Sequence, residues 1–319
     1  MGGLSVRALV EDTREELGFE VVAGEGGLDR SFVSAAIVRP GLALSGYLEH
    51  SPSGRVLLFG GTELAYLSSL EEGLRRERLK AVITPEVPCV IVARDFAIPD
   101  ELLEVARETG TPVLVSSRLF LKLASSLHIY LENRFAPETF VHGALMDVAG
   151  VGILILGASG VGKSECALDL VRKGHRLVAD DVVRITLRSG SLLMGSAAEV
   201  IRHYIEIHGL GVINVKDVFG VGAVRTRKRV SLVVRLDEWD SGREYDRLGL
   251  DERVVTILGV RVPEIVLPVK PGRNLATLVE VAGLNQRLKS MGEHPAVQLG
   301  ERLTRQMKAD EEDEREDAG

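Results

Sequence analysis

The chain has 319 residues, of which 45% are hydrophobic and 27% are charged. This composition is typical of a soluble globular protein, and the length suits two domains. The formal net charge is -7, but the run DEEDERED at residues 310–317 carries seven acids and one arginine, so the rest of the chain is almost neutral. This balance argues against a nucleic-acid-binding surface, and residues 310–319 are expected to form a disordered acidic tail.

The two cysteines, Cys89 and Cys166, lie far apart in the sequence and show no metal-ligand spacing. They predict neither a disulfide framework nor a zinc site, and we expect Cys166 to be a packing residue. No apolar segment reaches the length of a membrane span, and the first residues lack the basic-then-apolar order of a signal peptide. The expected protein is therefore cytoplasmic and does not associate with a membrane.

Residues 1–134 are predicted to form an N-terminal α/β domain, because apolar runs alternate with helical patterns. The strand-like runs are 33–38, 56–59, 82–83, 89–92 and 113–115, and helices are expected at 6–17, 63–70, 99–109 and 119–133. This half contains no catalytic motif, so we expect a role in assembly or regulation. Arg39-Pro40-Gly41 predicts a chain reversal rather than a ligand site. Pro137 ends the last helix and marks the domain boundary.

Residues 151–181 contain a phosphate-binding motif in its expected context. Apolar residues from 151 to 156 predict a buried strand, and a helical pattern begins at Ser164. Between them, GASGVGKS matches G-x-x-x-x-G-K-[ST], in which backbone N–H groups and a helix N-terminus cradle phosphates. Lys163 adds a mobile positive charge, and Ser164 is placed to contact Mg²⁺. The motif predicts that a nucleotide binds Gly157, Ala158, Ser159, Gly160, Val161, Gly162, Lys163 and Ser164.

The predicted second domain, residues 135–309, surrounds this motif. Strand patterns occur at 139–148, 175–179, 182–187, 192–194, 203–207, 212–215, 230–236 and 261–269, and a helix is expected from 275 to 291. The first of these strands should carry His142 toward the nucleotide.

Asp180 and Asp181 directly follow the strand predicted at residues 175–179. Carboxylates at the carboxyl end of a strand near a phosphate loop are suited to coordinate Mg²⁺ or to act as a general base. Because alternate strand residues face opposite sides, the two should not share one role. The alternative is a pair of turn aspartates that cap the strand.

Two further carboxylates are candidate metal ligands, and spacing does not separate them. Glu206 lies between two isoleucines and before a Gly-Leu-Gly sequence, so we expect it to be buried beside a closely approaching ligand. Asp237 ends the apolar run 230–236 in the manner of a Walker B aspartate.

Basic residues near the end of the second domain are candidate anion contacts. Arg247 lies in a charged, glycine-containing loop and could neutralise a transferring phosphoryl group. Lys270 and Arg273 lie in a basic turn before a helix, where an anion could bind. For Arg247 taken alone, the pattern favours a solvent-exposed ion pair. For the other two, a solvated turn is equally consistent with the pattern.

Four stretches together resemble the bacterial HPr kinase/phosphorylase family, the serine kinases of the phosphocarrier protein HPr. They are His142-Gly143, GASGVGKSE with GHRLVADD, IEIHGLGVIN, and YDRLGL followed by PVKPGRN. They occur in the family's order, and RPGLALSGY extends the resemblance into the N-terminal half. The implied fold is an N-terminal α/β domain plus a C-terminal P-loop kinase domain with a mixed sheet, similar to phosphoenolpyruvate carboxykinase.

The resemblance implies a bifunctional enzyme of carbon catabolite regulation. With ATP and Mg²⁺ or Mn²⁺ it would phosphorylate a serine of HPr, and with inorganic phosphate it would remove that group and release pyrophosphate. Asp181 would be the base of the forward reaction and the acid of the reverse one, supported by His142, Lys163 and Arg247. A homohexamer is also implied.

The resemblance also implies the remaining site residues. Ser164 and Glu206 would be the metal ligands, which favours Glu206 over Asp237. Two further segments would belong to the site. One is the signature-like stretch with Ile205, Ile207, His208, Gly209, Leu210, Gly211, Val212, Ile213 and Asn214. The other, with Val269, Lys270, Pro271, Gly272, Arg273 and Asn274, would matter chiefly for dephosphorylation. The chain departs from the family at His208, where arginine is usual, and at Ala158, where aspartate is common.

Two alternatives keep part of this site. A P-loop kinase with a different small-molecule or protein substrate would retain Lys163, Ser164 and Asp181. A non-catalytic ATP sensor would need only the phosphate loop, and the joint presence of Asp181, Glu206 and Arg247 argues against it.

Overall fold

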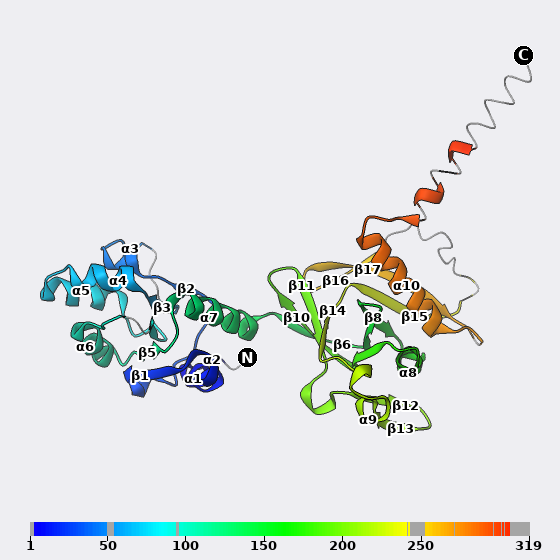
Figure 1. Cartoon of the computed structure of the whole chain (residues 1–319), viewed down its shortest axis with the longest axis horizontal. Coiled ribbons are helices and arrows are strands. Elements are labelled where there is room, and N and C mark those ends of the chain that lie inside the picture. The colour runs from blue at the N-terminus through cyan, green and yellow to red at the C-terminus, as the bar shows by residue number, and fades with distance from the viewer. Residues whose placement is uncertain are drawn as a thin grey trace, which may run out of the picture. The chain divides into compact units, whose positions relative to one another are not determined.

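The computed structural model describes residues 3–49, 54–93, 96–240, 242, 253–270, 272–295, 297–300, 302 and 304–306. By its internal contacts the chain divides into two compact units, Met1–Ala136 and Pro137–Gly319 (Figure 1). Among the described residues, no helix is long and apolar enough to cross a membrane. Arg247, Pro271 and the predicted acidic tail lie outside the described residues.

The N-terminal unit contains a five-stranded sheet in the order β1-β5-β4-β3-β2. Its four parallel strands are β2 (Ile37–Val38), β3 (Val56–Phe59), β4 (Val90–Ala93) and β5 (Val113–Ser116), and β1 (Phe19–Ala23) runs antiparallel to β5. The inner strands are continuously apolar because helices cover both faces of the sheet.

The helices of this unit divide between the two faces of the sheet. Apolar residues of α1 (Val6–Asp12), α2 (Arg14–Leu17) and α7 (Phe120–Phe135) pack with Leu58 and Ile91 on one face. Those of α3 (Gly41–Leu44), α4 (Gly61–Ser68), α5 (Glu72–Val82) and α6 (Asp100–Thr109) pack with Leu57 and Val92 on the other. The alternation follows from the two-residue period of a strand.

The predicted elements of this unit are mostly present, with three local differences. The strand predicted at residues 82–83 is wrong, since Val82 is the buried end of an amphipathic helix, α5. The helix predicted over 6–17 breaks at Thr13, whose hydroxyl donates to the carbonyl of Leu9 at 2.7 Å. Only Ile37–Val38 of the predicted run 33–38 forms a strand.

Arg39 stabilises the start of α4 through an ion pair with Glu63. Its guanidinium donates to the buried Glu63 carboxylate at 3.0 Å and lies over the Phe120 ring. Glu63 in turn accepts the N–H of Gly60 at 3.1 Å, which caps α4. The conspicuous Arg39-Pro40 pair therefore has a structural role.

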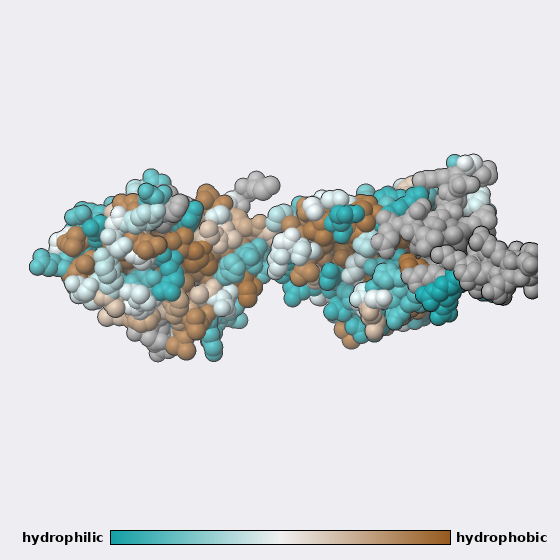
Figure 2. All heavy atoms as spheres, turned by 90° about the horizontal axis from the view of Figure 1, so that it is seen from above, coloured by the Kyte–Doolittle hydropathy of each residue, from teal (hydrophilic) through white to brown (hydrophobic). Residues whose placement is uncertain are grey.

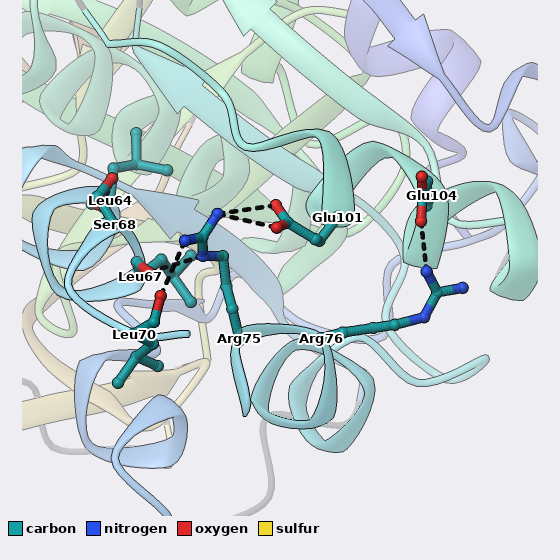
Figure 3. Close-up of polar contacts among 8 residues, drawn as sticks. All are labelled: Leu64, Leu67, Ser68, Leu70, Arg75, Arg76, Glu101 and Glu104. Atoms are coloured by element: carbon teal, nitrogen blue, oxygen red, sulfur yellow. Dashed lines mark hydrogen bonds and ion pairs between the residues drawn. The ribbon is translucent and has the colours of Figure 1, made fainter. Parts of the chain in front are cut away.

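Arg75 of α5 joins three helices of the N-terminal unit (Figure 3). It donates to the Glu101 carboxylate of α6 at 2.9 Å and to the carbonyls of Leu67 and Leu70, at 2.8 Å each. Neighbouring Arg76 pairs with Glu104, but both of those side chains are more exposed. Arg75 is thus the better-buried of two adjacent arginines that make the same kind of contact.

We expect Arg75→Ala to destabilise the packing of α5 on α6 by about 2 kcal/mol, because several charge-assisted hydrogen bonds are lost at once. Hydrogen exchange of residues 72–82 and 100–109 measures this change. Arg76→Ala is the matched control and should alter exchange much less, because its pairs face solvent. Equal effects of the two substitutions would contradict the assignment.

The C-terminal unit is built on a six-stranded sheet, which is mixed, as the family resemblance implies. The order is β16 (Arg253–Ile257), β17 (Val260–Val269), β15 (Leu232–Glu238), β8 (Val151–Gly157), β7 (Ala144–Val148) and β9 (Arg176–Ala179). β17, β15 and β8 are parallel, whereas β16 and β7 run antiparallel to their neighbours.

One face of this sheet is covered by α8 (Lys163–Arg172) and α10 (Leu275–Ser290). The other face packs against a four-stranded antiparallel sheet of β14 (Arg227–Arg229), β11 (Leu192–Ser196), β10 (Val182–Arg188) and β6 (Glu138–His142). A separate hairpin, β12 (Tyr204–Ile207) and β13 (Gly211–Asn214), leads into α9 (Val215–Phe219).

The single strand predicted over 139–148 is wrong, because the chain changes sheets at Gly143. β6 before it joins the four-stranded sheet, and β7 after it joins the six-stranded one. A Cβ atom at Gly143 would lie 2.5 Å from the carbonyl oxygen of Ile155, so no larger residue fits this crossing. The change of sheet leaves His142 at the end of β6.

Some large apolar side chains remain exposed in each unit, including Leu121 and Val200. Accordingly, hydrophobic areas interrupt the hydrophilic surface on the face that Figure 2 shows.

Candidate active site

The phosphate loop connects the buried strand β8 to helix α8, as predicted. Gly160 and Gly162 adopt φ values of 78° and 98°, which residues with a Cβ atom rarely adopt. At Gly157, a Cβ atom would lie 2.6 Å from the carbonyl oxygen of Leu236 on the neighbouring strand β15. The glycines of the motif therefore serve both the turn and its packing against the sheet.

Lys163 is the first residue of α8, and its side chain folds back over the loop. Its Nζ donates to the carbonyl oxygens of Gly157 at 3.1 Å and Ala158 at 2.7 Å. These carbonyl groups accept hydrogen bonds from the ammonium group but do not neutralise its charge. The charge thus stays beside the N-terminus of α8, where the helix dipole also favours an anion.

Ser164 and Asp180 form a hydrogen bond between the loop and the end of β9. The Ser164 hydroxyl donates to Asp180 Oδ2 at 2.9 Å. Asp180 is only 6% exposed, and this burial raises the pKa of its carboxyl. Hydrogen bonds from Ser164 and from the backbone N–H of Glu206 oppose that rise. The pair therefore brings a desolvated carboxyl group to the phosphate loop.

Asp181 faces away from Asp180 and lies beside His142. Its side chain is 63% exposed, and its Oδ1 lies 3.1 Å from His142 Nδ1. The same Nδ1 lies 2.7 Å from the Asp181 carbonyl oxygen, which also accepts the N–H of Gly143 at 3.0 Å. Asp181 has φ of 66°, so the backbone turns sharply here. The two adjacent aspartates thus have different surroundings, one buried and one open to a substrate.

Glu206 lies on β12, but its side chain is exposed, so the expectation of a buried carboxylate is wrong. β12 belongs to a two-stranded hairpin, in which Ile205 faces the core and the next residue faces outward. The backbone N–H of Glu206 nevertheless lies near Asp180 and lowers the pKa of its carboxyl. The hairpin therefore lies beside the Ser164–Asp180 pair.

The other residues of this segment have clear local roles. Gly209 and Gly211 adopt positive φ values of 80° and 92° and form the hairpin turn, with exposed His208 beside them. Asn214 caps α9 and accepts the N–H of Lys216 at 3.0 Å. Residues 205–214 thus form one compact hairpin and cap next to the phosphate loop.

The residues at the loop fit a hard divalent cation such as Mg²⁺ or Mn²⁺. Ser164 donates its proton to Asp180, so its oxygen lone pairs stay available to a cation. Within the described residues there is no group of three or more His, Cys, Asp or Glu side chains that could hold a metal ion. A cation here would take few protein oxygens and would depend on phosphate and water oxygens, as Mg²⁺ commonly does.

Residues 269–274 lie beside the end of β15, except for Pro271, which is not described. Lys270 Nζ lies 3.1 Å from the centroid of the Trp239 ring. Arg273 donates to the carbonyl of Pro268 at 3.3 Å, and Asn274 caps α10 by accepting the N–H of Thr277. Asp237 lies on β15 opposite Pro268. The segment is thus tied to the carboxyl ends of β15 and β17.

The structure therefore gathers the phosphate loop, Asp181, His142 and the Glu206 hairpin around the ends of β8 and β9. From the sequence, Asp180 and Asp181 were candidates for the same two roles, and the resemblance gave a specific role only to Asp181. Because successive strand residues face opposite sides, one of the two had to point inward. That alternation is the signal that identifies Asp180.

Two family models match the chain: "HPr Serine kinase N terminus" over residues 4–131 and "HPr Serine kinase C-terminal domain" over residues 133–303. The HPr kinase/phosphorylases of Bacillus cereus (strain AH820) and Bacillus anthracis (strain A0248) are each 49% identical over 293 residues, covering 92% of this chain and 95% of theirs.

A solved structure, the Hpr(Ser) kinase/phosphatase from Coxiella burnetii, is 37% identical and covers 48% of this chain and 93% of its own, with a TM-score of 0.46. Both family models match, and the two Bacillus relatives match over nearly their whole length. The chain therefore belongs to the HPr kinase/phosphorylase family.

Proposed function

We propose that this protein transfers the γ-phosphoryl group of ATP to a serine of HPr and reverses that transfer with inorganic phosphate, releasing pyrophosphate. The observation that carries the proposal is the difference in surroundings between two adjacent aspartates. Asp180 is buried and bonded to Ser164 of the phosphate loop, whereas Asp181 is open and bonded to His142. A nucleotide sensor would need the first arrangement but not the second.

In the forward direction, the oxygen of the substrate serine bonds to the γ-phosphorus of ATP, and the bond between that phosphorus and ADP breaks. The Asp181 carboxylate accepts the proton of the serine hydroxyl in this step. His142 positions that carboxylate through Nδ1, which lies within hydrogen-bonding distance of Asp181 Oδ1 and of the Asp181 main-chain carbonyl oxygen. Phosphoryl transfer depends mostly on such positioning and on charge neutralisation. The exposed carboxylate suits a protein substrate, because a serine on another chain must reach it.

In the reverse direction, an oxygen of inorganic phosphate bonds to the phosphorus of phosphoserine, and the serine oxygen leaves. Asp181 takes up the proton that the attacking phosphate releases and gives it to that serine oxygen. Pyrophosphate is then the product, held where the β- and γ-phosphates of ATP lie. One carboxyl group used in both directions is consistent with an overall reversible reaction.

Positive charge at the donor side is supplied by Lys163 and by the N-terminus of α8. Among the described residues, Lys163 is held only by loop carbonyls, so its ammonium can turn to phosphate oxygens without breaking an ion pair there. Ser164, Asp180 and Glu206 would hold Mg²⁺ or Mn²⁺, which when bound neutralises phosphate charge. Arg247, outside the described residues, and Lys270 are proposed to contact the phosphoryl group and the attacking phosphate.

We propose a cytoplasmic protein that works in carbon catabolite regulation as a homohexamer, with HPr as its partner and with no nucleic-acid or membrane partner. The N-terminal unit, residues 1–134, would serve assembly or regulation, and residues 135–309 would carry catalysis. In the N-terminal unit, apolar side chains fill both faces of the sheet, which is consistent with a structural role.

Purified protein, HPr and Mg-ATP test the forward reaction. We expect mass spectrometry to find one added phosphoryl group on a serine of HPr. HPr with that serine replaced by alanine is the control and should stay unmodified. Unmodified wild-type HPr in the presence of bound ATP would overturn the proposal.

A further inference from the structure

A carboxylate of helix α10 joins that helix to the turn between α8 and β9. Glu280 Oε2 accepts a hydrogen bond from Lys173 Nζ at 2.9 Å, and its Oε1 lies 3.1 Å from His175 Nε2. Lys173 and His175 flank Gly174, whose φ of 93° lets α8 end and the chain turn back into β9. Two side chains from one tight turn therefore meet a single carboxylate of another helix.

This contact is partly shielded from water. The side chain of His175 is 12% exposed and that of Glu280 is 29% exposed. The hydrogen bond from Lys173, and then that from His175, lowers the pKa of the Glu280 carboxyl and so favours its charged form. Neighbouring Arg172 pairs with Asp169 at 3.8 Å, and these two side chains are 70% and 55% exposed. The Glu280 contact is therefore the stronger of the two, because it is shorter and less screened by solvent.

Lys173 extends the contact to the first turn of α10. Its Nζ also donates to Thr277 Oγ1 at 2.7 Å. The N–H of Thr277 donates to the side chain of Asn274, the N-cap of α10, at 2.9 Å. Next to this cap, the N–H of Arg273 donates to the carbonyl oxygen of Lys270 at 3.2 Å. A series of hydrogen bonds thus leads from the turn after α8 to Lys270.

Both ends of this series belong to the candidate active site. Helix α8 begins at the phosphate loop, and β9 leads to Asp181, so the turn between them connects the two. At the other end, Lys270 Nζ lies over the ring of Trp239, the residue after β15. Glu280 therefore links the elements that carry the phosphate loop and Asp181 to the basic turn that carries Lys270 and Arg273.

We propose that Glu280 is a positioning residue for the reverse reaction. By holding α10 against the turn between α8 and β9, it fixes Lys270 and Arg273 where the attacking inorganic phosphate binds. This inference rests on the proposed function, in which Lys270 contacts that phosphate. Phosphoryl transfer depends on how accurately such groups are held. Without Glu280, binding of inorganic phosphate should weaken, whereas ATP, which the phosphate loop holds, should be affected much less.

Steady-state kinetics of Glu280→Ala and Lys173→Met test this role. We expect the KM for inorganic phosphate to rise about tenfold in phosphorolysis, while kcat and the KM for Mg-ATP in phosphorylation change less than about twofold. Lys173→Arg keeps the charge and the donors and should retain the wild-type KM. Arg172→Met is the matched control, because it removes a cation from the adjacent, more exposed position. Equal losses in both directions, or the same loss in Arg172→Met, would overturn the proposal.

A second measurement needs no turnover. Trp239 is the only tryptophan of the chain, so its fluorescence reports whether Lys270 stays on its ring. Quenching of this fluorescence by acrylamide should increase in Glu280→Ala, as in Lys270→Ala, and should stay at the wild-type level in Arg172→Met. Unchanged quenching in Glu280→Ala would overturn the inference whether or not HPr is the substrate. Increased quenching supports it even if the wild type releases no pyrophosphate, a result that would refute the proposed function alone.

Discussion

Asp181→Asn is expected to lower the rates of both phosphorylation and phosphorolysis about a thousandfold, while Mg-ATP still binds. The asparagine amide cannot accept the serine proton, and it cannot return a proton in the reverse reaction. The fold should tolerate the change, because asparagine also adopts the positive φ found at this position. Initial rates by mass spectrometry and fluorescence titration of a labelled nucleotide measure the two effects.

The matched control is Asp169→Asn, which makes the same chemical change on the exposed surface of α8. It should leave both rates near those of the wild type. Loss of nucleotide binding in Asp181→Asn, with turnover limited only by that loss, would instead assign Asp181 to the metal or to the loop structure.

Asp180→Asn is expected to lower activity about a hundredfold while raising the thermal stability of the nucleotide-free protein. Burial raises the pKa of the Asp180 carboxyl, so the charged form is disfavoured in the folded state. Above its ordinary pKa of 3.8, the unfolded chain releases this proton more readily than the folded one. The contribution of this carboxyl group to the free energy of unfolding is therefore fully present below that pH. It is lost as the pH rises through the pKa that the group has in the folded state.

Calorimetric melting of the two proteins from pH 4 to pH 7 measures the effect. The stability advantage of Asp180→Asn should be largest at neutral pH and should shrink toward acidic pH. Asp181→Asn, at an exposed carboxylate, is the control and should show little change in melting temperature. A variant less stable than the wild type at neutral pH would show that Asp180 serves as a structural acceptor.

The sequence predicted those features that depend on local pattern. The phosphate loop is one, because glycines in the motif stand where the backbone adopts positive φ values. β3 is another, since a buried parallel strand leaves a continuous apolar run. α5 was missed because its sequence, EGLRRERLKAV, is mostly charged and buries only Leu79 and Val82. Its stability comes from contacts with α6 that no local pattern records.

Features that depend on tertiary contacts were predicted less well. The expected strand over 139–148 splits at Gly143 because the two halves pair with different sheets. Glu206 is exposed because its strand belongs to a hairpin with only one buried face. Ser164 and Asp180 are sixteen residues apart, and their hydrogen bond exists only because α8 crosses over β7 to reach β9.

Phosphorolysis tests the central claim most directly. Phosphoserine-HPr is incubated with the enzyme, the divalent cation and isotopically labelled inorganic phosphate, and the products are separated. We predict one labelled pyrophosphate for each serine released, because the phosphoryl group passes to phosphate and not to water. Release of unlabelled inorganic phosphate without pyrophosphate, or no dephosphorylation at all, would contradict a reversible transfer through Asp181.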